Sequence, residues 1–212
     1  MLTYWNTYHD KILACLGQHL LITVLVLVIS ILLAALITLV LLPRRRASQV
    51  TVNLLGAFYS IPSLALFALM IPLLGLGLLP ALVVLVLYNQ FLLVRNFLDG
   101  FNQVDPALVE AATGLGMTPR QVTMQVRFPL AFPVLAAGVR LAVISTIGIA
   151  TIAAVIDAGG IGTILFEGLQ SQDPVKLIWG TLLVGGLAVA FNILLSAVER
   201  VSGSRLHYEE SE

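Results

Sequence analysis

"LLITVLVLVISILLAALITLVLL", Leu20 to Leu42, is a long run of the chain without a single charged residue. It is apolar on every side of a helix, and it lacks the period-two alternation of a membrane β-strand. A bilayer core about 30 Å thick needs roughly 20 such residues per helix. The run therefore predicts a membrane-spanning helix, and we expect an all-α fold.

The composition extends this prediction to the whole chain. Of 212 residues, 59% are hydrophobic and only 10% are charged, which is far outside the soluble globular range. We expect a polytopic membrane protein with a single transmembrane domain over residues 1–212 and five spanning helices. The spans are predicted near 19–42, 50–74, 78–98, 131–156 and 177–198. No basic region or small-residue cleavage pattern precedes the first run, so we expect no removable signal peptide.

Charge and residue counts exclude several classes of function. The formal net charge is zero and no basic patch is present, so nucleic-acid binding is not expected. A single cysteine, Cys15, excludes a multi-cysteine metal site, and we expect no metal. The histidines, His9, His19 and His207, lie near the chain ends. An intramembrane serine enzyme, which needs a base beside its nucleophile, is therefore disfavoured.

The basic residues predict the topology, because cytoplasmic loops retain positive charge. Eight of the 11 Lys and Arg residues share one side, Lys11 and Lys176 fall on the other, and Arg140 lies within the fourth span. The eight are Arg44, Arg45, Arg46, Arg95, Arg120, Arg127, Arg200 and Arg205. With five crossings, this places the N-terminus outside and the C-terminus in the cytoplasm.

A polar stretch, "EAATGLGMTPRQVTMQVRFP" from Glu110 to Pro129, interrupts the apolar chain on the predicted cytoplasmic side. Asp105 followed by Pro106 predicts an N-cap and a first-turn proline, with the helix ending at Gly114 or Gly116. Thr118, Pro119 and Gln121 predict a second start with a capping box. Its helix is expected to end before Pro129. The loop 104–129 should thus hold two short helices joined at a glycine bend.

Both short helices have features of a docking surface. The first carries the small Ala111 and Ala112 beside Glu110, and the second places Val122 and Val126 on one stripe. A solvated connector between two spans is the alternative interpretation. Such a connector could be shorter and would need no caps.

"EAATGLG" followed by "VRFP" at Val126 to Pro129 resembles the EAA loop of bacterial ABC importer permeases. In that family the loop forms coupling helices that sit in a groove of a cytoplasmic ATPase. The resemblance implies a type I ABC importer fold and a bacterial inner-membrane location. It assigns ATPase coupling to Glu110, Ala111, Ala112, Gly116, Thr118, Val126 and Pro129. Phe128 replaces the usual leucine.

Further stretches, among them "RNFLDG" from Arg95 and "AGVRLAVISTIGIATIAAVIDAGGIG" from Ala137, resemble the osmoprotectant branch, which carries glycine betaine, carnitine and choline. The methionine-type permeases are similar in layout, so a permease for methionine or another amino acid is the alternative. Asp157 departs from the glycine that is commoner in the branch. The chain also lacks the proline usual before its Arg95-Asn96 pair.

The sequence carries no energy source of its own. Neither Lys11 nor Lys176 lies in a glycine-rich phosphate loop, and no ladder of buried acids is available for ion coupling. We therefore expect a transport subunit rather than an enzyme, without a cofactor of its own. ATP and Mg²⁺ would be bound by a partner ATPase dimer. The resemblance also implies a second permease, identical or homologous, an external solute-binding protein, and surrounding lipid.

Several polar and aromatic residues inside the spans are candidates for the translocation path. Pro62 frees a backbone carbonyl and predicts a kink, and polar side chains in a span must face protein or water. Aromatic faces can bind a quaternary ammonium by cation–π contact. The candidates are Tyr59, Ser60, Ser63, Tyr88, Asn89, Arg140 and Trp179. Bridging between helices is the alternative role for these polar groups. A passive channel, the remaining alternative, would not require capped cytoplasmic helices.

Overall fold

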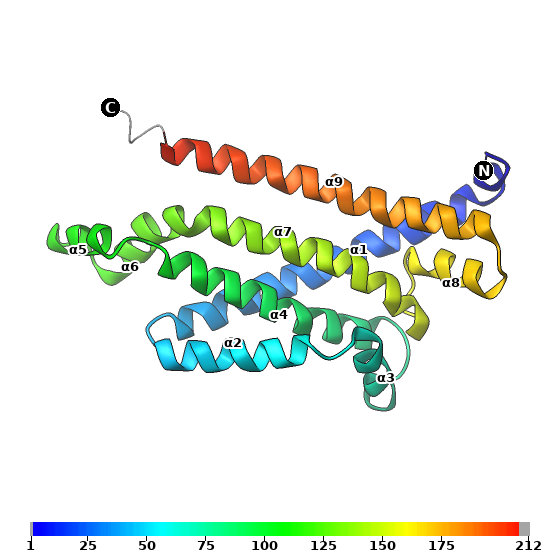
Figure 1. The fold of residues 1–212 in the computed structure, drawn as a ribbon, viewed down its shortest axis with the longest axis horizontal. Helices are drawn as coiled ribbons and strands as arrows, with labels where there is room; N and C mark the ends of the chain where they lie inside the picture. The colour runs from blue at the N-terminus through cyan, green and yellow to red at the C-terminus, as the bar shows by residue number, and fades with distance from the viewer. Residues whose placement is uncertain (1, 208–212) are drawn as a thin grey trace.

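The computed structural model describes residues 2–207, and over that range the chain is helical with short turns (Figure 1). The long helices are α1 (Leu2–Leu41), α4 (Leu78–Asn102), α7 (Phe128–Ala153) and α9 (Pro174–His207). The shorter helices are α2 (Arg45–Tyr59), α3 (Ser63–Leu74), α5 (Pro106–Gly114), α6 (Pro119–Gln121) and α8 (Gly162–Gln170), with a π-helix, η1 (Val122–Arg127), and a 3-10 helix, η2 (Ala154–Ile156). These residues contain no strand, so the all-α prediction is confirmed.

Four helices in the described part of the chain are long and apolar enough to cross a membrane by themselves. They are Trp5–Leu41, Leu78–Asn102, Pro119–Ile156 and Pro174–Ala197. α2 and α3 together qualify as a fifth, broken span. The order agrees with the five predicted spans, although α1 begins well before residue 19 and the helix of the fourth span extends back to Pro119.

The second span is broken rather than kinked. α2 and α3 meet at 90°, with the break at Ser60 to Pro62. Pro62 has no N–H to donate to the carbonyl of Phe58, and that carbonyl instead accepts from the N–H of Ile61 at 3.1 Å. The hydroxyl of Tyr88 on α4 donates to the carbonyl of Ile61. This contact connects the break to α4.

The centre of the bundle is the contact between α4 and α7. Leu93, Val94 and Phe97 of α4 pack with Ala142, Val143 and Ile147 of α7 in one buried cluster that α1 completes. Glycine permits the close approach: a Cβ at Gly138 of α7 would lie 2.5 Å from the Cβ of Asn96 on α4. Small residues at such crossings let helix backbones pack tightly in a membrane.

The two ends of the bundle carry different elements (Figure 1). The described C-terminal end of α9, the turn between α1 and α2, and the pair α5 and α6 lie at one end. The start of α1 and the short helix α8 lie at the other. The predicted cytoplasmic loop is thus at the end opposite to the start of α1.

The prediction that the second short helix ends before Pro129 is wrong. α6, η1 and α7 follow one another without a break. In η1 the N–H of Phe128 donates to the carbonyl of Thr123, five residues back. This π-turn shifts the hydrogen-bond register by one residue just where Pro129 lacks a donor, so Pro129 fits in the first turn of α7.

Candidate coupling surface and translocation residues

α5, the first short helix of the loop 104–129, has the predicted ends. The side chain of Asp105 accepts from the N–H of Ala107 at 2.8 Å, and Pro106 takes the first helical position. The helix ends at Gly114, and Gly116 follows with a φ of +83°. There the N–H of Met117 donates back to the carbonyl of Ala112 at 3.2 Å. Such a left-handed residue suits glycine, so the bend depends on Gly116.

The second start is also as predicted. The backbone N–H of Thr118 donates to Oε1 of Gln121 at 2.8 Å, and the N–H of Gln121 donates to the Thr118 hydroxyl at 3.4 Å. This reciprocal pair is the capping box read from the sequence. The turn from α5 to α6 is therefore fixed by local hydrogen bonds.

The exposed face of α5, α6 and η1 differs from the predicted one. Glu110 and Ala111 are exposed, but Ala112 and Val122 are buried and Val126 is half-buried, so the valine stripe packs largely inward. The apolar side chains that point outward are Leu108, Met124 and, above all, Leu115, which is 86% exposed. Sequence reasoning missed Leu115. A leucine placed between two glycines at a bend was the available signal.

Tyr59 and Tyr88 lie together at the break between α2 and α3. Their ring centroids are 5.4 Å apart with the rings edge to face, and Tyr59 also lies 5.0 Å from the ring of Phe91. Ser60, on the same turn, is exposed and donates to the carbonyl of Gly56, and Ser63 begins α3. The structure thus brings four of the translocation candidates to one place.

Asn89 lies deeper than these residues. It is buried between α4 and α7, and its Nδ2 donates to the hydroxyl of Thr146 at 2.8 Å. The neighbouring Gln90 donates to the carbonyl of Ser30 on α1. These contacts are the bridges that polar groups form between membrane helices. A transport role for Asn89 stays a prediction.

Arg140 and Trp179 lie away from the tyrosines. Nε of Arg140 is 3.0 Å from Oε1 of Glu199 on α9, and its Nη1 donates to Ser196 at 3.2 Å. Trp179 stacks on Trp5 of α1 with ring centroids 5.6 Å apart. Arg140 therefore joins α7 to α9, and Trp179 joins α9 to α1. The seven candidates do not form a single site.

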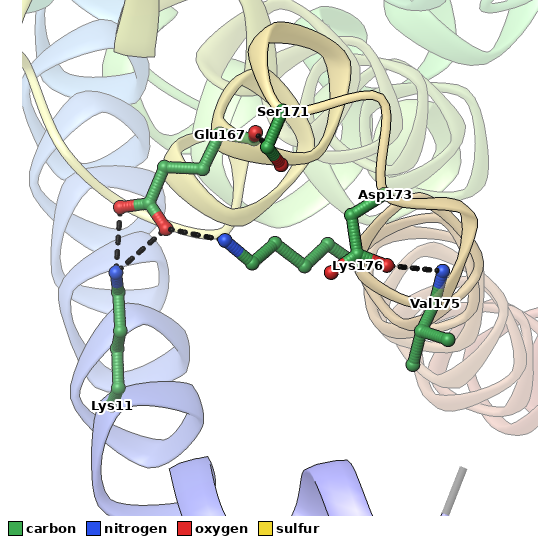
Figure 2. Close-up of polar contacts among 6 residues, drawn as sticks. All are labelled: Lys11, Glu167, Ser171, Asp173, Val175 and Lys176. Atoms are coloured by element: carbon green, nitrogen blue, oxygen red, sulfur yellow. Dashed lines mark hydrogen bonds and ion pairs between the residues drawn. The ribbon is translucent and has the colours of Figure 1, made fainter.

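A charge cluster at the end of the bundle opposite α5 and α6 was not predicted (Figure 2). Nζ of Lys11 on α1 lies 2.6 and 2.7 Å from the two carboxylate oxygens of Glu167 on α8. Nζ of Lys176 on α9 lies 3.8 Å from Oε2 of the same side chain. Both lysines of the chain thus converge on one acid and connect three helices. Pairs this exposed each contribute about 0–1 kcal/mol.

The glycine cluster after α7 is held by α1. The N–H of Gly160 donates to Oε1 of Gln18 at 3.1 Å, and the N–H of Ile161 donates to Nδ1 of the buried His19 at 3.3 Å. Asp157 begins this turn with a φ of +64°, a left-handed conformation that glycine adopts freely and aspartate tolerates. That explains why glycine is suited to this position.

In the part of the chain that the structure describes, no three His, Cys, Asp or Glu side chains gather as a metal site would require.

The sequence model of the binding-protein-dependent transport system inner membrane component matches residues 26–208. The chain belongs to this family. It is a permease component of the inner membrane, and the resemblance read from the loop 104–129 is confirmed.

Named relatives and solved structures agree with this assignment. The chain is 34% identical to the glycine betaine/carnitine/choline transport system permease protein OpuCB of Bacillus subtilis (strain 168), covering 94% of this chain and 92% of that protein. It is 42% identical to the osmoprotectant import permease protein OsmW of Salmonella typhimurium, covering 67% and 68%. The fold superposes on the MetNI methionine ABC transporter in an inward-facing conformation with a TM-score of 0.82, at 19% identity and 90% and 95% coverage. The type I importer fold is therefore confirmed.

Proposed function

We propose that this permease carries quaternary-amine osmoprotectants of the glycine betaine, carnitine and choline class, driven by ATP hydrolysis in a separate ATPase dimer. The observation that carries the proposal is the likeness to OpuCB over nearly the whole of both chains. The capped helices α5 and α6, with the exposed Glu110 and Leu115, supply the surface on which an ATPase would act. ATP and Mg²⁺ would bind to that partner.

The other partners follow from the same family. An external solute-binding protein would deliver the solute, and a second permease, identical or homologous, would complete the route, because five spans are too few to surround one. Exposed apolar side chains on α3 and α9, such as Leu73 and Ile193, would contact lipid or this second subunit. A permease for methionine or another amino acid is the second candidate, and the MetNI fold supports it.

The test is to purify the intact complex from its native membrane and identify its chains. ATP hydrolysis is then measured with the co-purified binding protein and one solute at a time. Stimulation by glycine betaine, carnitine or choline supports the proposal. Stimulation by methionine or another amino acid alone would favour the second candidate. The absence of any ATPase chain would contradict both.

The predicted topology has its own test. The single cysteine is replaced by alanine, and one new cysteine is placed in each of two exposed positions, Ser171→Cys after α8 and Gln103→Cys before α5. On intact spheroplasts, a membrane-impermeant maleimide is expected to label the Ser171→Cys protein and to label the Gln103→Cys protein only after permeabilisation. The reverse pattern would place the C-terminus outside.

A further inference from the structure

A polar cavity lies between α2 and α4, toward the end of the bundle that carries α5 and α6. Its volume is about 450 Å³, within the ~300–1,000 Å³ of small-molecule sites. Its walls combine one cation, one anion, three amides and one hydroxyl in a chain that is mostly apolar. The lining residues are Arg45, Ser48, Gln49, Val52 and Asn53 of α2 and Leu98, Asp99 and Asn102 of α4.

The spacing of these residues shows that two helix faces meet here. Arg45, Gln49 and Asn53 are four residues apart and form one stripe of α2, while Asp99 and Asn102 lie one turn apart on α4. α2 has no fully buried residue, so its polar face borders a gap instead of closing against α4. In the described chain the amides of Gln49, Asn53 and Asn102 have no side-chain hydrogen bond, and their donors and acceptors are available to a ligand.

The same two faces continue from the cavity to the broken span. One turn beyond Asn53, Gly56 approaches Phe91 so closely that a Cβ would lie 3.0 Å from its ring. Phe91 in turn contacts Tyr59, beside Tyr88 at the break. The guanidinium of Arg95 lies 5.8 Å from the centroid of the Phe91 ring, within the range of a cation–π contact. A polar end and an aromatic end are thus joined along one seam.

We propose that this cavity is a solute subsite on the inward side of the route and holds a zwitterion between two charges. Arg45 would bind the carboxylate, and Asp99 would face the quaternary ammonium, which has no N–H to donate and is therefore recognised through its charge and by aromatic faces. Asp99 now lies 3.8 Å from Arg95 in an exposed pair, and such a pair is weak enough for a cation to compete with it. This assignment rests on the proposed function. It names the residues that would bind the solute and the charges that the solute must carry.

The test compares solutes that differ in one group. Uptake of carnitine, glycine betaine and choline is measured in proteoliposomes of the whole complex with saturating binding protein. Arg45→Gln is expected to slow the two zwitterions about tenfold and to leave choline, which has no carboxylate, within twofold. Asp99→Asn is expected to slow all three. Equal loss of all three solutes in Arg45→Gln, or no loss in either variant, would overturn the proposal.

Two neighbouring residues supply matched controls. Arg46→Gln removes the same charge one residue along α2, outside the cavity lining, and is expected to transport all three solutes like wild type. Arg95→Gln removes the partner of Asp99 but no wall of the cavity, and is expected to keep zwitterion uptake. A loss in Arg46→Gln as large as in Arg45→Gln would indicate a general effect of charge and would count against the subsite.

A zwitterionic lipid headgroup has the same chemistry as the solute, so the lipid is varied as well. In vesicles of phosphatidylglycerol alone, the selective defect of Arg45→Gln is expected to persist. Its disappearance there, with its return when phosphatidylcholine is added, would assign the cavity to lipid and overturn the proposal. If wild type imports no quaternary amine but imports an amino acid, the proposed function fails by itself. Uptake of that amino acid is then measured in Arg45→Gln, because its carboxylate would also bind Arg45.

Discussion

Glu110→Lys and Gly116→Val are each expected to reduce ATP-driven uptake about tenfold or more while the protein still inserts in the membrane. Glu110 is exposed on α5 and has no ion-pair partner in the described residues, so it is available to a partner chain. Reversing its charge removes a charge-assisted contact of about 1.5–3 kcal/mol, which corresponds to roughly tenfold or more in affinity. Gly116 has a φ of +83°, and a β-branched residue held there costs of order 1–3 kcal/mol.

Matched variants separate coupling from folding. Glu110→Gln keeps the shape of the side chain and should retain part of the uptake. Gly114→Val changes a glycine two residues away that has open space and no left-handed φ, and should be milder than Gly116→Val. The measurements are uptake, ATPase activity and retention of the ATPase on the purified permease. Full uptake in both Glu110→Lys and Gly116→Val would disprove the coupling role.

Gly138→Val is expected to separate α4 from α7 and to destabilise the whole bundle. The added Cβ alone would lie 2.5 Å from the Cβ of Asn96, and the valine methyl groups would extend further into α4. Overpacking of this kind costs about 1–3 kcal/mol. We expect a lower melting temperature of the detergent-purified protein and less monodisperse protein after extraction.

Gly148→Val on the same helix is the control, because nothing lies within 4 Å of a Cβ at that position. It changes the sequence in the same way without touching a neighbouring helix, so its melting temperature should equal that of wild type. If Gly138→Val and Gly148→Val had the same melting temperature, the close crossing of α4 and α7 would not be a source of stability.

Local sequence signals predicted the starts of the short helices correctly, whereas the helix end expected before Pro129 was wrong. Asp105 with Pro106, and Thr118 with Gln121, gave the starts of α5 and α6 because a cap depends only on residues within one turn. The lengths of the apolar runs gave the spans for a similar reason, since the bilayer thickness is fixed.

Contacts between distant residues were beyond the sequence. Pro62 predicted a kink, but the sequence showed neither the 90° angle nor the contact that Tyr88 makes with Ile61 from another helix. Arg140 was placed within the fourth span, yet nothing nearby in the sequence points to Glu199 as its partner. The inward turn of Val122 likewise depends on how α5 packs beside η1. The error at Pro129 has a local cause instead. The π-turn of η1 shifts the hydrogen-bond register, so the helix continues although Pro129 has no N–H to donate.

The unbroken path from α6 through η1 into α7 has a mechanical consequence. A hinge at Pro129 would have let the surface helices swing without moving the bundle. Instead, the segment is one continuous helical path that runs from the short helix α6 to the α4 crossing at Gly138. A displacement of α6 would therefore reach α7 directly, and the close approach of Gly138 to Asn96 on α4 lies on that path.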